Sequence, residues 1–185
     1  MYYVGIGSRK TPITIQRDMH DIATELETLG IILRSGGAIG AEQAFERGVT
    51  LDALKTIYYA NHYVKNGTRY RYDNNHWHTA REYICHIHPN WNALTEYAKS
   101  LHTRNYYQVM GLPDEEPSSF VICYTPDRCE YNDLRNKITG GTGTAITVAN
   151  AKNIPVFNLF NNDSYESLRM FLDKLMENRH YGRSP

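Results

Sequence analysis

The sequence predicts an α/β protein with a Rossmann-like, three-layer α/β/α fold and a mostly parallel sheet of about five strands. Short apolar runs alternate along the chain with segments whose apolar residues recur at helical spacing. Three of the apolar runs lead into glycine-containing loops, which are common where a strand connects to a helix. This alternation is typical of parallel sheets, because right-handed crossovers place the connecting helices on the faces of the sheet.

The N-terminal residues 2–8 read YYVGIGS, an apolar run that ends in glycine and serine. This pattern predicts a buried strand that opens onto a loop. Apolar side chains then recur at helical spacing over residues 15–29, which predicts a helix with Thr14 as its N-cap. Gly30 follows as the expected stop.

The next segment repeats the same order of elements. Residues 31–37, IILRSGG, predict a second strand that ends in glycines, and residues 38–48 predict a helix that ends at Gly48. Residues 54–60, LKTIYYA, predict a third strand. From about 61 to 90 no period is sustained, so we expect an irregular insertion there.

The remainder of the chain returns to the alternation of helices and strands. The expected elements are a helix at 91–102, a strand at 120–125, a polar loop at 126–138, a helix at 143–152, a strand at 154–159 and an amphipathic helix at 164–177. No repeat or linker interrupts them, so we expect a single domain over residues 1–185 that carries the insertion.

Composition limits the classes of function. The chain has 185 residues, with 20 Lys and Arg against 20 Asp and Glu, and a formal net charge of zero. This balance argues against non-specific binding to DNA through a broadly basic face, but it leaves a local basic groove open. The mean hydropathy of −0.57 indicates a polar surface. Three cysteines without zinc or redox spacing predict no disulfide framework.

Targeting signals are not evident in the sequence. The N-terminus leads directly into a predicted strand, and no apolar run approaches the roughly 18 residues of a membrane span. We therefore expect a cytoplasmic protein that has no membrane partner.

Three glycine loops are expected at one edge of the sheet. They read GIGSRKTP, RSGGAIGAE and TGGTGT, and ligands of open parallel sheets bind at the carboxyl ends of the strands. Glycines let a ligand approach the main chain, and the amides of a following helix point at anions. No P-loop or G-x-G-x-x-G spacing is present. The sequence thus predicts a phosphate site built from Gly7, Ser8, Arg9, Ser35, Gly36, Gly37, Gly140, Gly141, Thr142, Gly143 and Thr144.

Each polar candidate also has a structural interpretation. Arg9 and Arg34 flank strands, where a guanidinium pairs with phosphate or forms an ordinary salt bridge. The serine and threonine hydroxyls act as ligand contacts or as helix caps. Glu42 binds a ribose hydroxyl or complements the dipole of its helix.

The insertion is rich in histidine and aromatic residues. Its histidines lack the spacing of an established metal site, so we expect no metal at His62, His76, His78, His86 and His88. Arg71 lies in the run RYRY, and together with Trp77 it interleaves cations with flat rings. Such a segment suits stacking on a base, a lid over the site or a subunit contact.

Four segments carry a resemblance to a known family. They read VGIGSRKTP, LRSGGAIGAEQAFERG, LHTRNYYQVMG and GGTGTAITVANAKNIPVFNL. Together they resemble the SLOG superfamily, which joins the Rossmann-like core of DprA (Smf) proteins with the LOG phosphoribohydrolases. The resemblance covers nearly the whole chain except about 61–90, and the chain looks like a standalone DprA-like protein of the kind found in phage and bacterial genomes. It also implies a homo-oligomer and adds Arg104 and Asn105 as candidate ligand contacts.

The resemblance implies three functions. LOG enzymes carry PGGxGTxxE, but here Thr139 replaces the proline and Thr147 replaces the glutamate, so hydrolysis would depend on Glu42. DprA proteins bind single-stranded DNA and assist loading of a recombinase. Other superfamily members recognise nucleotide-derived signals, including those of antiphage defence. We expect binding of a phosphorylated nucleotide or nucleotide-derived signal without turnover or cofactor; the alternatives are DprA-like single-stranded DNA binding and LOG-like phosphoribohydrolysis.

Overall fold

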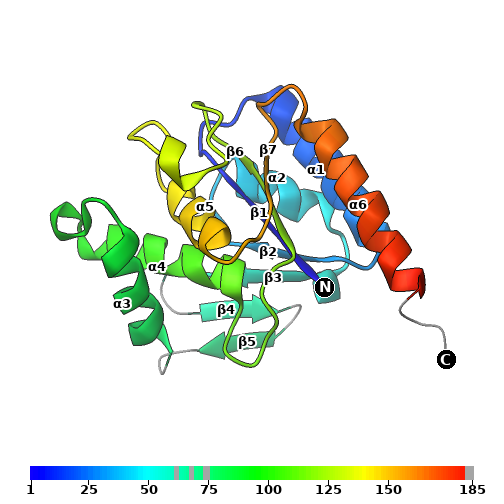
Figure 1. Ribbon diagram of the computed structural model, residues 1–185. Coiled ribbons are helices and arrows are strands. Elements are labelled where there is room, and N and C mark those ends of the chain that lie inside the picture. Colours follow the sequence, from blue (N-terminus) through cyan, green and yellow to red (C-terminus); the bar gives the residue numbers. More distant parts are fainter. Residues whose placement is uncertain (61–62, 67–68, 73–75, 182–185) are drawn as a thin grey trace.

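A computed structural model of the protein contains one mixed sheet between two layers of helices (Figure 1). It describes residues 1–60, 63–66, 69–72 and 76–181, with the side chains of 1–60 and 76–177. The sheet has seven strands in the order β5-β4-β3-β2-β1-β6-β7. The prediction of a Rossmann-like α/β/α fold is confirmed.

Five neighbouring strands of this sheet run parallel, and the predicted glycine loops lie at their carboxyl ends. They are β3 (Lys55–Tyr58), β2 (Ile32–Ser35), β1 (Tyr2–Gly7), β6 (Phe120–Tyr124) and β7 (Val156–Asn158). The chain builds outward from β1 through β2 to β3, then returns to place β6 on the other side of β1. The strand order therefore reverses at β1, and this reversal opens a crevice at the carboxyl ends of β1 and β6.

Helices cover both faces of the sheet. On one face, α1 (Ile13–Thr28), α2 (Ala41–Gly48) and α6 (Ser164–Tyr181) contribute Met19, Phe45 and Leu168 to a core that also contains Tyr3, Leu33 and Phe120. On the other face, α3 (Trp77–Ile87), α4 (Glu96–Met110) and α5 (Thr142–Ala151) contribute Ile84, Val109 and Ile146 to a core with Val4, Ile6 and Val121. Alternate residues of β1 thus face opposite cores, as the period of a strand requires.

Two helix starts differ from the sequence prediction. Thr14 does not cap α1, because the helix already begins at Ile13 and Pro12 occupies the N-cap. The helix expected at 91–102 begins later, at Glu96, where the hydroxyl of Thr95 accepts a hydrogen bond from the Ala98 amide at 3.2 Å. Gly30 follows α1 with a φ of 67°, a conformation that favours glycine, and it ends the helix as expected.

The segment 61–90 is more regular than the sequence suggests. Strands β4 (Tyr63–Asn66) and β5 (Arg69–Tyr72) extend the sheet in antiparallel fashion beyond β3. Helix α3 follows and buries Trp77, Ala80 and Ile84, which share one helical face. The polar residues between these positions, among them His78, Arg81 and Glu82, hid the helical period.

The remaining short elements are the 3-10 helices η1 (Asp52–Leu54), η2 (Trp91–Ala93) and η3 (Asn132–Leu134). In the described part of the chain, no helix has the length and apolar character needed to cross a membrane.

Candidate functional site

The three glycine loops meet at the carboxyl edge of the sheet around a cavity of about 410 Å³. Gly7, Ser8 and Arg9 of the first loop line it after β1. The second loop contributes Ala38 and the third contributes Gly140, Gly141 and Thr142. Helix α4 closes the cavity with Ala98, Leu101, His102, Arg104 and Asn105.

Arg104 and Asn105 hold two of the loops in place. The Arg104 Nη1 donates to the Gly36 carbonyl at 2.8 Å, and the Asn105 Nδ2 donates to the Gly141 carbonyl at 2.9 Å. A Cβ at Gly36 would lie 2.4 Å from the Cζ of Arg104, so this close approach requires glycine. The structure therefore brings both residues to the cavity and gives them a structural role beside any contact with a ligand.

Glu42 is the ion-pair partner of Arg104. Its carboxylate is 2% exposed, and its Oε1 lies 3.2 Å from the Arg104 Nη2 and 3.5 Å from the Gln108 Nε2. The Oε2 accepts from the Ala38 amide at 2.7 Å. Because both oxygens are engaged and the pair is buried, Glu42 stabilises Arg104 and is not poised to activate water.

Hydrogen-bond donors of the second glycine loop are paired with a carboxylate of the protein itself. The sequence analysis instead predicted that this loop contacts phosphate. The Oε1 of Glu46 accepts from the Ser35 hydroxyl at 2.5 Å and from the Gly37 amide at 3.0 Å. Burial raises the pKa of Glu46. This carboxylate takes the position expected for a bound anion, so Ser35 and Gly37 are not open to phosphate.

The third loop keeps open donors at the start of α5. The amides of Gly143 and Thr144 turn back to the carbonyls of Gly140 and Gly141 at 3.2 and 3.1 Å. The amides of Gly141 and Thr142 have no acceptor among the described residues. Together with the helix dipole, these two amides form the part of the site best suited to a phosphate oxygen.

The space beneath the third loop is filled by side chains of the protein. The Thr144 hydroxyl is fully buried and lies 2.7 Å from the His102 Nδ1 and 3.2 Å from the Arg135 Nη2. A Cβ at Gly143 would lie 2.6 Å from the Arg135 Nε, so glycine makes room for that guanidinium. Thr144 and Gly143 therefore support the loop from below, which corrects their assignment as ligand contacts.

The first loop presents two cations to the cavity. Arg9 and Lys10 are exposed, and neither has a carboxylate partner in the part of the chain that the structure describes. The Ser8 hydroxyl accepts from the Lys10 amide at 3.0 Å, which shapes the turn. The salt-bridge alternative for Arg9 is thus not realised.

Arg34 and Trp77 lie away from the cavity, which corrects both candidate assignments. Arg34 is fully buried, where its Nη2 lies 3.1 Å from the Glu115 Oε2 and its guanidinium lies over the ring of Tyr2. Trp77 is 4% exposed and stacks on Tyr107 with ring centroids 5.7 Å apart. The side chain of Arg71 lies outside the described residues, as does His62.

Two further cavities adjoin the first one. A cavity of about 380 Å³ shares Arg9, Ala38, Leu101 and Arg104 with it. Another of about 840 Å³ shares His102, Gly140 and Gly141 with it. We call these three cavities together the edge groove, which extends from the end of β3 across β1 to the loop before α5.

The edge groove is positively charged although the chain is neutral overall. Among the described residues that line it, Glu42 is the one carboxylate, and it is paired with Arg104. The described cationic side chains that line it are Arg9, Lys10, Arg104, Arg135 and Lys137. Tyr97 adds an aromatic ring that is 67% exposed. Such a groove attracts a polyanion and offers a ring for stacking.

Sequence reasoning missed Lys10, Tyr97, His102, Arg135 and Lys137. The three cations among them had a usable signal, because Lys10 lies beside Arg9, and Arg135 and Lys137 lie four and two residues before the loop TGGTGT. Tyr97 and His102 had no such signal, although the resemblance named Arg104 and Asn105 on the same helix. Burial lowers the pKa of His102 to about 4, with smaller contributions from the charges of His88 and Arg135. Burial likewise lowers the pKa of His88, whose ring lies 4.4 Å from that of His102.

No cluster of three or more His, Cys, Asp or Glu side chains suited to a metal occurs among the described residues. Cys123 is fully buried in β6.

Comparisons with known proteins bear on the fold. No family model matches the chain, and a search of curated proteins finds no match. The chain is similar to DNA processing protein A from Helicobacter pylori, a protein with a described single-stranded DNA binding mode, with a TM-score of 0.58 and 17% sequence identity. The superposition covers 96% of this chain and 81% of that chain. The chain therefore has a DprA-like fold.

Proposed function

We propose that the protein binds single-stranded DNA along the edge groove. The observation that carries this proposal is the gathering of five cationic side chains around three adjoining cavities that hold one already paired carboxylate. The fold shared with a single-stranded DNA binding protein supports it. This was the alternative to small-ligand binding in the sequence analysis, and the shape and charge of the groove favour it.

In the proposed complex, different residues of the edge groove contact the phosphates and the bases of the DNA strand. The amides of Gly141 and Thr142 hold one phosphate at the start of α5. Arg9, Lys10 and Lys137 neutralise neighbouring phosphates, while Tyr97 stacks on a base. Arg104 stays paired with Glu42 and fixes the loops between which the strand passes.

Binding of a phosphorylated nucleotide or nucleotide-derived signal is the second candidate. The central cavity of about 410 Å³ falls within the range of small-ligand sites, and it contains both open amides. Membership of the SLOG superfamily and a homo-oligomeric state are proposed with either candidate, whereas a role in phage–host defence is proposed with this one. Phosphoribohydrolysis has less support, because both oxygens of Glu42 already accept hydrogen bonds.

Titration calorimetry separates these candidates. We expect oligo-dT to bind with an affinity that rises with length between about 4 and 16 nucleotides, the span of known single-strand sites. Mononucleotides and ADP-ribose derivatives should bind more weakly, since each fills one cavity. Saturable binding of a mononucleotide that is as tight as binding of the longest oligonucleotide would contradict DNA binding and support the second candidate.

A further inference from the structure

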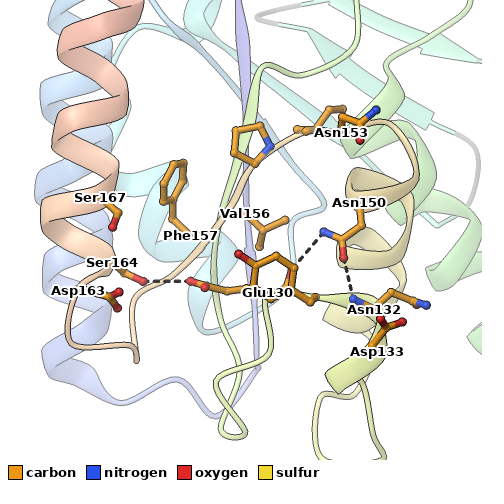
Figure 2. Close-up of a pocket in the computed structure, with 13 residues that line it drawn as sticks. Glu130, Asn132, Asp133, Asn150, Asn153, Val156, Phe157, Asp163, Ser164 and Ser167 are labelled. Atoms are coloured by element: carbon orange, nitrogen blue, oxygen red, sulfur yellow. Dashed lines mark hydrogen bonds between the residues drawn. The ribbon is translucent and has the colours of Figure 1, made fainter.

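A separate cavity of about 660 Å³, which we call the β7 edge cavity, lies at the β7 edge of the sheet (Figure 2). Ile154, Pro155, Val156 and Phe157 form its apolar base along the edge strand. One wall is the loop 130–133 with the end of α5, and the opposite wall is the start of α6 (Figure 2). Of the described residues, Asn132 alone lines both this cavity and the edge groove.

The outer side of β7 carries unpaired backbone groups. The Pro155 carbonyl accepts from Val121 at 2.9 Å and the Leu159 amide donates to Cys123 at 2.9 Å, so these residues direct their bonding groups towards β6. Val156 therefore directs its N–H and C=O away from the sheet. Neither group has a partner among the described residues, although both lie at an edge where another strand can pair.

The open stretch of β7 has a defined end at Asn158. The amide of Asn158 donates to the Glu130 Oε1 at 2.6 Å. Its carbonyl accepts from the Ser164 hydroxyl at 2.6 Å and from the Asn161 amide at 2.8 Å. An added strand can thus form hydrogen bonds with Val156 but not with Asn158, whose backbone groups are already bonded. This limits the site to a short segment.

The charge around this cavity is the reverse of that in the edge groove. Glu130, Asp133 and Asp163 line it, and no Lys or Arg does so among the described residues. The Oε1 of Glu130 also accepts from the Ser164 hydroxyl at 3.1 Å, as Figure 2 shows, while its Oε2 has no described partner. The apolar base between these carboxylates suits the aliphatic stem of a lysine or arginine.

We propose that the β7 edge cavity docks a short, extended, basic segment of a partner protein, which pairs with Val156 as an added strand. Backbone hydrogen bonds to Val156 supply the alignment, and the carboxylates select lysine or arginine side chains. A second copy of this chain fits poorly, because a symmetric contact would place the same carboxylates opposite one another. The site is separate from the edge groove, so the partner and DNA can bind together.

Fluorescence anisotropy with the purified full chain tests this proposal. The probe is a labelled hexapeptide that alternates valine with lysine, and the comparison peptides carry glutamate in place of lysine or N-methyl groups on alternate backbone amides. We expect the basic peptide to bind and the glutamate peptide to bind at least about tenfold more weakly, as the loss of one charged hydrogen bond implies. The N-methylated peptide should also bind more weakly, because it cannot donate to the backbone of Val156. Amide shifts in a nitrogen-edited NMR spectrum should centre on residues 154–158.

Variants provide the second arm. Asp133 and Asp163 are exposed, so the double change Asp133→Asn with Asp163→Asn should keep the fold and weaken peptide binding about tenfold. Asp173→Asn, an exposed carboxylate of α6, should have no effect. Equal binding of the basic peptide to the double variant, shifts outside the β7 edge, or self-association through β7 in sedimentation would overturn the proposal.

Discussion

At the scale of single residues, Arg104 decides where the second glycine loop lies. Its guanidinium donates to the Gly36 carbonyl and pairs with Glu42, and it is 7% exposed. Asn105 makes the equivalent tie to Gly141. The adjacent pair therefore links two loops that are far apart in the sequence, and it does so through carbonyl groups, which leaves the amides of the third loop open.

We predict that Arg104→Met destabilises the fold. The change leaves Glu42 buried without its cation, which costs about 3–5 kcal/mol in the free energy of unfolding. Urea denaturation followed by circular dichroism measures this loss. Arg81→Met is the control, because Arg81 pairs with the largely exposed Glu96 and should matter little. A loss no larger than that of the control would mean that the Arg104–Glu42 pair does not hold the site.

Gly141 allows the open amide to be tested directly. Its φ of −63° suits proline, and a Cβ there would meet only the His102 Cε1 at 4.0 Å. Gly141→Pro removes the amide donor, whereas Gly141→Ala keeps it. We expect the proline variant to bind oligo-dT about tenfold more weakly, because a hydrogen bond to a charged group contributes about 1.5–3 kcal/mol. The alanine variant should bind like the wild type, and equal affinities for both variants would exclude a phosphate at this amide.

At the scale of elements, α4 and α5 shape the groove. Helix α4 crosses the carboxyl edge with Arg104 and Asn105 in contact with the loops, and α5 begins at the open amides. His102 of α4 bonds to Thr144 of α5 and so joins the two helices at the base of the groove.

Protonation of His102 should destabilise this junction. Because its folded pKa of about 4 lies below the ordinary value of 6.5, the unfolded chain binds the proton first as the pH falls. The stability that the neutral ring contributes is therefore present above pH 6.5, and it is lost as the pH falls from 6.5 to about 4. Asn at this position offers an amide near the place of Nδ1 without titrating.

We therefore expect His102→Asn to lose less stability than the wild type when the pH is lowered from 7 to 5. Chemical denaturation at both pH values gives the comparison. His78→Asn is the matched control for the exchange of histidine for asparagine, because His78 is exposed on α3 and does not take part in this junction. The same loss in the His102 variant as in the wild type would contradict a buried neutral ring.

Strands and most helices were predictable because their apolar periods are strong. Apolar runs in the sequence correspond to the five parallel strands β1, β2, β3, β6 and β7. The glycine loops also lie where they were predicted. Helix α3 was missed because polar residues separate Trp77, Ala80 and Ile84. The internal carboxylate of Glu46 at the second loop was also missed, since sequence cannot show which helical acid turns back to an amide.

At the scale of the whole molecule, charge is separated although the net charge is zero. Cationic side chains gather at the edge groove, and carboxylates gather around the β7 edge cavity. Bulk composition argued against a broadly basic DNA-binding face, and the local groove shows why that argument is limited. Sequence reasoning could place the loops that form the groove, and the resemblance named Arg104 and Asn105 of α4, but nothing in the sequence pointed to Tyr97 and His102 of the same helix.

The salt dependence of oligo-dT affinity tests the central claim most directly. If Arg9, Lys10 and Lys137 contact phosphates, log K should fall with log salt at a slope of about −2, from about −0.7 for each contact. Arg9→Ala with Lys137→Ala should reduce the slope by about 1.4, whereas Arg169→Ala on α6 should not change it. A slope near zero, or one that the groove variants leave unchanged, would contradict DNA binding at the edge groove.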